Sequence, residues 1–304
     1  MTFSHPLLTS ALAAALLTAG VSDTPLSAAT LQPQPPPAAD TPAVTLPSLP
    51  LLTTPTVLPE TVPDLLDLHS GPASQESPSA AQAVAGTAQF PSDLIDLKNW
   101  SLTLPTGNAG DPADVTPPQL PKFANEFFRV NKSRDGVVFT ATVGGVTTKN
   151  SHYPRSELRE MNGEAKAAWS NTSGTHTLSV REAILAVPPV KPEVVAVQIH
   201  DDADDVMQIR LEGQRLMVQS DDGKTETVLD PAYKLGTVYD VQIVAHDGRV
   251  DVIHNGVKKA ELNKSGTGWY FKVGAYVQSN PERGDRVGAP GTVAVYSLNV
   301  THSR

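Results

Sequence analysis

The sequence predicts an all-β domain over residues 89–304, built from two antiparallel sheets packed face to face. Three observations lead to this prediction. Short segments of alternating apolar and polar residues are separated by turn signals every 8–15 residues. Dipeptides typical of hairpin turns occur at Asp135-Gly136, Asp222-Gly223, Asp247-Gly248 and Asn255-Gly256. No window of 12 or more residues keeps the 3.6-residue period of an amphipathic helix.

The first 22 residues have the features of an export signal. Leu7 to Leu17 is an apolar run rich in Ala and Leu, followed by small residues. The run is too short for a bilayer span, which needs about 20 residues, but it fits the apolar region of a secretory signal peptide. The preceding segment departs from the usual pattern because it has no Lys or Arg. We expect residues 1–22 to be a signal peptide and the mature protein to be secreted, extracellular and free of the membrane.

Residues 23–88 form a region of different composition. They contain 13 of the 27 prolines, with Ala, Ser, Thr, Gln and Leu between them. Proline lacks the amide donor and fixes φ, so neither a helix nor a central strand can run through such a region. We expect a disordered linker that carries no catalytic group.

Charge and cysteine content exclude several classes of function. The net charge is −9, yet the first basic residue is Lys98, so residues 98–304 are nearly balanced. No broad basic surface exists for a nucleic-acid partner. The chain has 0 cysteines, which excludes disulfides, thiolate zinc sites, iron–sulfur clusters and cysteine nucleophiles.

The first strand with chemistry on it is expected at residues 153–160. Side chains alternate between the two faces of a strand, so Arg155, Glu157 and Arg159 share one face. An isolated pattern of this kind is usually an ion-paired outer face. Its functional interpretation is a pair of guanidinium groups, oriented by Glu157, that bind carboxylates in bidentate geometry.

The second such strand is expected at residues 195–200. Val195, Val197 and Ile199 form its apolar face, and Gln198 and His200 point the other way. A histidine at a strand end is often only a solvated surface residue. Beside Gln198 it also suits catalysis, because imidazole is a base near neutral pH and an amide can donate to an oxygen that gains charge.

The later strands continue the two-residue period. Met207, Ile209 and Leu211 alternate with polar residues, and further strands are expected at 239–245 and 249–254. In the segment 270–278, one face consists of apolar residues. The other face carries Lys272, Gly274, Tyr276 and Gln278. Gly274 is expected to leave room between Lys272 and Tyr276 for a flat ligand.

Together these strands place two Arg, a Gln, a His, a Lys and a Tyr on the outer face of a sheet. This set suits an extended polyanion. It also contains the groups needed for β-elimination from a uronic acid. A cation or amide neutralises the carboxylate at C5, a base removes the C5 proton, and an acid protonates the departing O4.

At these residues the chain resembles the alginate lyases of polysaccharide lyase family 7. The motif R-S-E-L-R stands at Arg155–Arg159, Q-I-H at Gln198–His200, and Y-F-K-x-G-x-Y-x-Q at Tyr270–Gln278. The motifs follow the family's order, and the resemblance extends from about residue 90 to the C-terminus. It implies a β-jelly-roll whose concave sheet forms the substrate groove.

The resemblance also implies roles for individual residues and the mode of action. Arg155 and Gln198 would neutralise the substrate carboxylate, His200 would be the base, and Tyr276 the acid. Glu157, Arg159, Lys272 and Gln278 would bind substrate. Ile at position 199 tends to accompany action on guluronate in this family, so guluronate or mixed blocks are the expected substrate. We expect the enzyme to be endolytic and monomeric.

Three alternatives use the same fold. A glycoside hydrolase of the laminarinase type would carry two close carboxyl groups on one strand, usually as E-x-D-x-x-E, and no such string is present. A non-catalytic carbohydrate-binding jelly roll would need an aromatic platform, whereas Trp100, Trp169 and Trp269 are scattered. A lyase for another polyuronate, such as glucuronan, stays open because every polyuronate presents the same carboxylate.

The reaction needs no metal or other cofactor, since side chains supply the positive charge. The acidic run Asp201–Asp205 lacks the Gly and the distal Glu of a calcium loop. We therefore expect an acidic surface turn there and no metal ligands.

Overall fold

The structure is a computed structural model that describes residues 85–303. The expected signal peptide and nearly all of the expected linker lie outside these residues. Within them, helical structure is limited to single turns of 3-10 helix, which are η1 (Ala85–Thr87), η2 (Pro91–Asp93), η3 (Leu120–Lys122) and η4 (Pro281–Arg283). No helix in this part of the chain is long and apolar enough to span a membrane. The all-β prediction is confirmed.

One antiparallel sheet carries the predicted site. It has nine strands, with the short β6 (Ala165–Lys166) paired to β5 at its edge. The order across the sheet is β11 (Thr225–Asp230), β10 (Arg215–Ser220), β9 (Asp205–Glu212), β8 (Glu193–His200), β15 (Tyr270–Val277), β5 (Arg155–Asn162), β1 (Trp100–Asn108) and β2 (Asp111–Val115). The three strands expected to carry chemistry are therefore neighbours, in the order β8, β15, β5.

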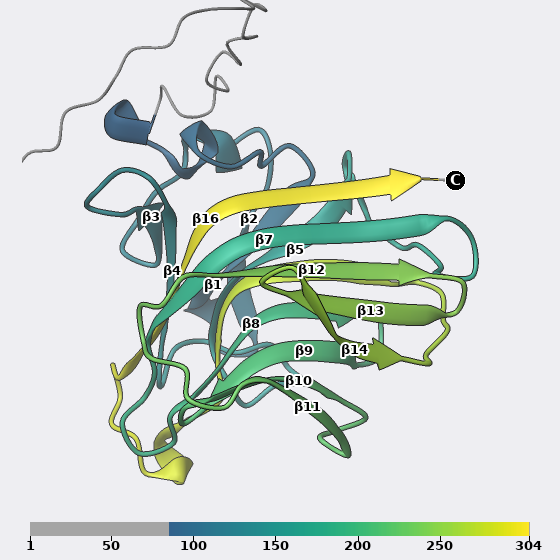
Figure 1. Cartoon of the computed structure of the whole chain (residues 1–304). Helices are drawn as coiled ribbons and strands as arrows, with labels where there is room; N and C mark the ends of the chain where they lie inside the picture. Colours follow the sequence, from purple (N-terminus) through teal and green to yellow (C-terminus); the bar gives the residue numbers. More distant parts are fainter. Residues whose placement is uncertain (1–84, 304) are drawn as a thin grey trace, which may run out of the picture. The chain divides into compact units, whose positions relative to one another are not determined.

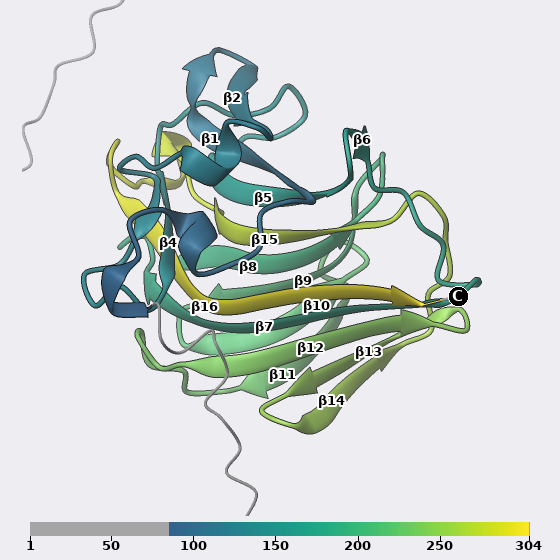
Figure 2. The same cartoon turned by 90° about the horizontal axis from the view of Figure 1, so that it is seen from above.

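The second sheet has seven strands and packs on the first (Figures 1 and 2). Its order is β14 (Val257–Leu262), β13 (Arg249–His254), β12 (Tyr239–His246), β7 (Thr175–Ala186), β16 (Pro290–Ser303), β4 (Val137–Thr142) and β3 (Phe128–Val130). The last strand in the sequence, β16, lies in the interior of this sheet between β7 and β4.

Three of the four expected hairpin dipeptides form tight turns. Asp247-Gly248 joins β12 to β13 and Asn255-Gly256 joins β13 to β14, with all four residues at positive φ between 47° and 77°. Asp222-Gly223, also at positive φ, lies between β10 and β11. Such conformations match the twist of paired strands and favour Asn, Asp and Gly. Asp135-Gly136 differs, because the left-handed residue in the longer β3–β4 loop is Arg134.

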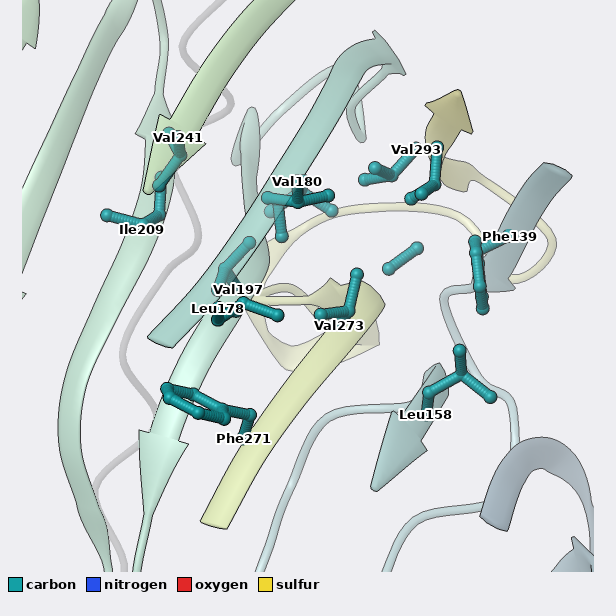
Figure 3. Close-up of a cluster of buried hydrophobic side chains, with 14 of the residues drawn as sticks. Phe139, Leu158, Leu178, Val180, Val197, Ile209, Val241, Phe271, Val273 and Val293 are labelled. Atoms are coloured by element: carbon teal, nitrogen blue, oxygen red, sulfur yellow. The ribbon is translucent and has the colours of Figure 1, made fainter. Parts of the chain in front are cut away.

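The core lies between the two sheets, where the apolar faces of the strands meet (Figure 3). Phe271 and Val273 of β15 and Val197 of β8 are fully buried there, opposite residues of β7 such as Leu178. The buried residues of β15 and β8 alternate along their strands with residues of the predicted site. Burial of the apolar set therefore fixes which side chains point outward.

Packing begins before the expected domain boundary at residue 89. Ala88 is buried, with 2% of its surface exposed, and its carbonyl oxygen accepts a hydrogen bond from Arg134 Nη1 at 3.1 Å. The last residues before the boundary thus contact the domain.

Candidate active site

A groove with a volume of about 720 Å³ lies on the outer face of the nine-stranded sheet. Its lining extends from β1 and β2 at one side, across β5, β15 and β8, to β9 and β10. Six of the predicted site residues line it, namely Arg155, Gln198, His200, Lys272, Tyr276 and Gln278. The structure thus brings together side chains from three distant segments of the sequence.

Strand register explains how these side chains meet. β15 lies between β8 and β5, and all three are antiparallel neighbours. Tyr276 is opposite Arg155 of β5, while Lys272 is opposite Gln198 of β8 and Arg159 of β5. Paired residues on one face have Cβ atoms about 5 Å apart, so charged groups here interact directly.

Gly274 also has a structural role within the sheet. Its φ is 153°, which side-chain-bearing residues rarely adopt, and an added Cβ would lie 2.7 Å from Glu157 Cα. The missing side chain therefore lets β15 approach the backbone of β5. The groove depends on this close approach, because Tyr276 and Lys272 flank Gly274 on the same strand.

Glu157 is the buried centre of the site. Only 1% of its surface is exposed, and it does not line the groove. Its Oε2 contacts Arg155 Nη1 at 3.2 Å and Lys272 Nζ at 2.6 Å, and its Oε1 accepts a hydrogen bond from Gln198 Nε2. One carboxylate thus holds three groups of the groove floor in place.

This arrangement shifts two pKa values. Burial alone would raise the pKa of Glu157, but the charges of Lys272 and Arg155 outweigh it and hold the pKa below its usual range. Burial, followed by the charge of Arg155, lowers the pKa of Lys272 to about 8, although Glu157 opposes that shift. At neutral pH, Glu157 is a carboxylate and Lys272 is mostly protonated.

His200 is oriented by its Nδ1 atom. Nδ1 lies 2.5 Å from the backbone oxygen of Asp201 and 3.2 Å from the hydroxyl of Tyr270, whose ring stacks on the imidazole. A carbonyl can only accept, so Nδ1 carries the hydrogen and Nε2 holds the free lone pair. Burial and the charge of Lys272 lower the pKa of His200. The imidazole is therefore neutral and basic at Nε2 at pH 7.

Tyr276 is held from two sides. The guanidinium carbon of Arg155 lies 3.8 Å from the centre of its ring, and its hydroxyl is 2.9 Å from Ser151 Oγ. A cation stacked on an aromatic ring is attracted by the ring's quadrupole, so this contact holds Tyr276 in place. The groove thus combines a neutral imidazole with a phenol beside positive charge.

Comparison with known proteins identifies the family. The family model described as "Alginate lyase" matches residues 95–302. The chain belongs to the alginate lyase family. Alginate lyase AlgAT5, of polysaccharide lyase family 7, is 49% identical, with a TM-score of 0.69 over 71% of this chain and 100% of that one. The alginate lyase from Corynebacterium sp. is 44% identical, with a TM-score of 0.69 over 71% and 99% of the two chains.

Among curated proteins, an alginate lyase from Klebsiella pneumoniae is 37% identical over 75 residues, which are 23% of this chain and 24% of that protein. The match therefore spans about a quarter of the curated relative. The solved structures, in contrast, are matched over nearly their whole length, and they confirm the expected jelly roll. The chain is thus an enzyme, a polysaccharide lyase of the alginate lyase family.

Two predicted substrate-binding residues of this lyase lie away from the groove lining. Glu157 is buried beneath it, as described above. Arg159 stacks on the ring of Tyr270, with its guanidinium carbon 3.8 Å from the ring centre, and Nη1 donates to the backbone oxygen of Glu160 at 2.8 Å. Arg159 therefore supports Tyr270, which in turn holds His200, instead of forming a row of cations with Arg155.

The sequence analysis missed several residues that line the lyase groove. Beyond His200, the lining includes Gln208 and Arg210 of β9 and Gln219 of β10. Arg210 is bound by carboxylates of Glu193 and Glu212 at 2.7 Å each. The alternation of side chains along this strand could have predicted them. Met207, Ile209 and Leu211 face the core, so Gln208 and Arg210 must lie on the opposite face.

The acidic run after β8 forms a turn, as expected. Asp201 Oδ1 accepts hydrogen bonds from the amides of Ala203 and Asp204 at 2.8 and 2.9 Å. Asp205, the first residue of β9, lines the groove of the lyase beside His200. Burial and the neighbouring Asp204 raise the pKa of Asp205 to about 6. A titrating negative charge thus lies near the proposed base.

A second cavity, of about 410 Å³, lies where the ends of β1, β5, β7 and β16 meet. Its polar groups bond one another: Glu160 Oε1 contacts His302 Nε2 at 2.6 Å, and His302 Nδ1 contacts His176 Nδ1 at 2.7 Å. It contains none of the predicted site residues. The groove is therefore the candidate active site of the lyase.

Proposed function

We propose that this enzyme cleaves alginate by β-elimination inside the chain, in the groove lined by Arg155, His200 and Tyr276. The substrate follows from family membership and from the cationic floor of the groove, which suits a polymer with one carboxylate per sugar. The arrangement of one neutral base and one phenol supports elimination.

The reaction proceeds in three linked events. Arg155 and Gln198 bind the carboxylate at C5, which stabilises the negative charge that develops when C5 loses its proton. His200 Nε2 takes that proton. The bond from C4 to O4 breaks as Tyr276 donates its proton to O4, so that a C4–C5 double bond forms without consumption of water.

The single observation that carries this proposal is the hydrogen bond of His200. Because Nδ1 faces the carbonyl of Asp201, the basic Nε2 is the nitrogen available to substrate in the groove. A lowered pKa keeps this nitrogen unprotonated at neutral pH.

Product and mutant analysis test the proposal. Digestion of alginate should release unsaturated uronates that absorb in the near ultraviolet, whereas hydrolysis would release none. His200→Ala, Tyr276→Phe and Arg155→Ala should each lower kcat by at least about 10²-fold, the usual contribution of a positioned acid or base. Near-wild-type turnover in any of the three would disprove the assigned mechanism. A panel of polyuronates, glucuronan included, tests the substrate.

Two features support the finer proposals on mode and preference. The groove lining extends across strands from β2 to β10, which suits binding in the middle of a polymer. Ile199 is fully buried in the core between Gln198 and His200, so it acts on the sugar only by setting the height of these neighbours. We propose endolytic cleavage with preference for guluronate or mixed blocks. Viscosity loss ahead of product release, and kcat/KM on separate homopolymeric blocks, test both.

Export is also part of the proposal. It is supported by the apolar run Leu7 to Leu17. N-terminal sequencing of the enzyme from culture medium should reveal a start beyond residue 22. A start at Met1 would contradict a cleaved signal.

A further inference from the structure

Ser151 forms a hydrogen bond with the Tyr276 hydroxyl and has no role in the mechanism so far. It lies in the loop between β4 and β5 and lines the groove. Its Oγ is 2.9 Å from Tyr276 Oη, 3.2 Å from the backbone oxygen of Tyr153 and 3.1 Å from the backbone nitrogen of Tyr153. Three partners thus surround one hydroxyl.

The hydrogen count of Ser151 limits what these contacts can be. A hydroxyl has one hydrogen to donate and two lone pairs. The amide of Tyr153 can only donate to Oγ, and the carbonyl of Tyr153 can only accept from it. If Ser151 donates to that carbonyl, Tyr276 must donate its own hydrogen to Ser151. In this arrangement the acidic hydrogen of Tyr276 points away from the substrate.

A second arrangement uses the same heavy-atom positions. Rotation of the Ser151 hydroxyl turns its hydrogen from the Tyr153 carbonyl to Tyr276 Oη. The hydrogen of Tyr276 is then free to face O4 of the substrate. When it leaves, Ser151 donates to a phenolate, and hydrogen bonds to a charged oxygen are about twice as strong as those between neutral groups.

We propose that Ser151 is a positioning residue that makes Tyr276 an acid by turning its hydroxyl hydrogen onto the phenol oxygen. This rests on the proposed function, in which Tyr276 protonates O4. The step is balanced: the Tyr276 O–H bond breaks, an O–H bond to O4 forms, and Ser151 keeps its own hydrogen. The His200 imidazolium and the Tyr276 phenolate are reset by proton exchange with water.

Several charged or titratable groups surround this phenol and must be kept in the test. Arg155 stacks on its ring, and Lys272, His200 and Lys149 line the same groove. Glu157 lies beneath the groove, paired with Lys272, and Lys191 lies over the ring of Tyr153. Lys272 titrates near pH 8, so an alkaline limb of the pH–rate profile does not by itself identify Tyr276. A direct phenolate signal is therefore needed.

The experiment compares Ser151→Ala and Ser151→Thr with the wild type, using the full chain. Phenolate absorbance is titrated for each protein with and without Tyr276→Phe, so that the difference isolates Tyr276. We expect Ser151→Ala to raise the Tyr276 titration midpoint by about one pH unit, as for loss of one hydrogen bond to a charged group. It should lower kcat at least about tenfold and leave KM within about twofold. Ser151→Thr keeps the hydroxyl, so its kcat and its Tyr276 titration midpoint should both lie close to those of the wild type.

Ser170→Ala is a matched control. Ser170 also accepts a hydrogen bond from an amide two residues on, that of Thr172 at 3.4 Å, but it lies outside the groove. Its kcat and Tyr276 titration should be unchanged. Melting temperatures show whether each variant folds, and if Ser151→Ala does not, Ser151→Thr is compared with Ser151→Cys, a weak donor.

The outcomes separate this inference from the proposed function. If Tyr276→Phe abolishes turnover while Ser151→Ala alters neither kcat nor the titration, the role of Ser151 is wrong and the mechanism stands. If Ser151→Ala lowers the residual activity of Tyr276→Phe as strongly as that of the wild type, Ser151 is only structural. If Tyr276→Phe retains full turnover, the assignment of the acid fails first.

Discussion

Lys272 of β15 is paired in register with Arg159 of β5, but it forms its ion pair with Glu157, two residues further along β5. The residue directly opposite Glu157 is Gly274, which has no side chain to block the diagonal reach of Lys272. A glycine on one strand thus permits a buried ion pair with the next. The floor of the groove is held together by this pair and by the bonds of Glu157 to Arg155 and Gln198.

Glu157→Gln should destabilise the fold by about 3 kcal/mol or more, because it leaves two buried cations without their counter-charge. Urea denaturation measures the change. Glu226→Gln is the matched control, since its partner Arg215 is also 3.2 Å away but the side chains of Arg215 and Glu226 are 49% and 33% exposed. Loss of that pair should cost less than about 1 kcal/mol. Equal effects of the two substitutions would contradict the central role of Glu157.

Glu182→Gln should alter how stability depends on pH. Glu182 is buried, Tyr239 donates to its Oε1 at 2.8 Å, and its Oε2 has no partner among the described residues. Burial raises its pKa to about 8, from 4.5. Between these values the folded state keeps the proton that the unfolded state has lost. Stability contributed by this carboxyl group therefore falls as pH rises from about 4.5 to 8, and then levels off.

The glutamine variant lacks this titration, so its unfolding free energy should rise relative to the wild type between pH 5 and pH 8, by on the order of 1.4 kcal/mol per unit at most. Using the difference between the two proteins removes the contribution of every other titrating group. A difference that stays constant with pH would show that Glu182 is ionised in the folded state.

Asp205→Asn should improve substrate binding at neutral pH. Above its pKa of about 6, Asp205 adds a negative charge to the groove and repels the polymer's carboxylates. The ratio of wild-type to variant KM should therefore be near one at pH 5 and rise a few-fold by pH 7.5, the effect of about 1 kcal/mol of repulsion. Asp247→Asn, in the β12–β13 turn of the other sheet, should change KM at neither pH. A ratio independent of pH would contradict the titration.

Removal of residues 1–84 should leave kcat/KM and the melting temperature unchanged, since the shortened chain keeps the buried Ala88 and every contact described for the domain. A chain that starts at Pro91 should be less stable by about 1–2 kcal/mol. It loses the buried Ala88 and the two hydrogen bonds that the backbone amides of Gln89 and Phe90 donate to Asp93. Comparison of the two truncated chains by thermal denaturation places the domain boundary. Loss of folding in the longer one would show that the preceding region is needed.

The alternation of side chains along single strands predicted which residues face the core and which face the groove. It could not predict contacts between neighbouring strands. It placed Phe271 and Val273 in the core and Lys272 and Tyr276 on the groove face. It also assigned Arg159 to the groove face, but a strand period gives only the direction of a side chain. The long arm of Arg159 lies on Tyr270 instead, a contact set by pairing between β5 and β15.

Residues outside the strands gave no comparable signal. Ser151 lies in a loop, where no period applies, and its partner Tyr276 is 125 residues away. The order β8, β15, β5 also depends on long-range pairing. The complementary chemistry of the three segments suggested one site, and the resemblance of their motifs to a known family supported it.

The position of β16 has a consequence for how the protein is made. The ribosome adds this strand after all the others, yet it lies between β7 and β4 in the middle of its sheet. Until it emerges, β7 and β4 have no shared neighbour and the seven-stranded layer is split. The seven-stranded sheet therefore cannot close until synthesis of the domain is complete, and until then the apolar faces of its strands are exposed to aggregation.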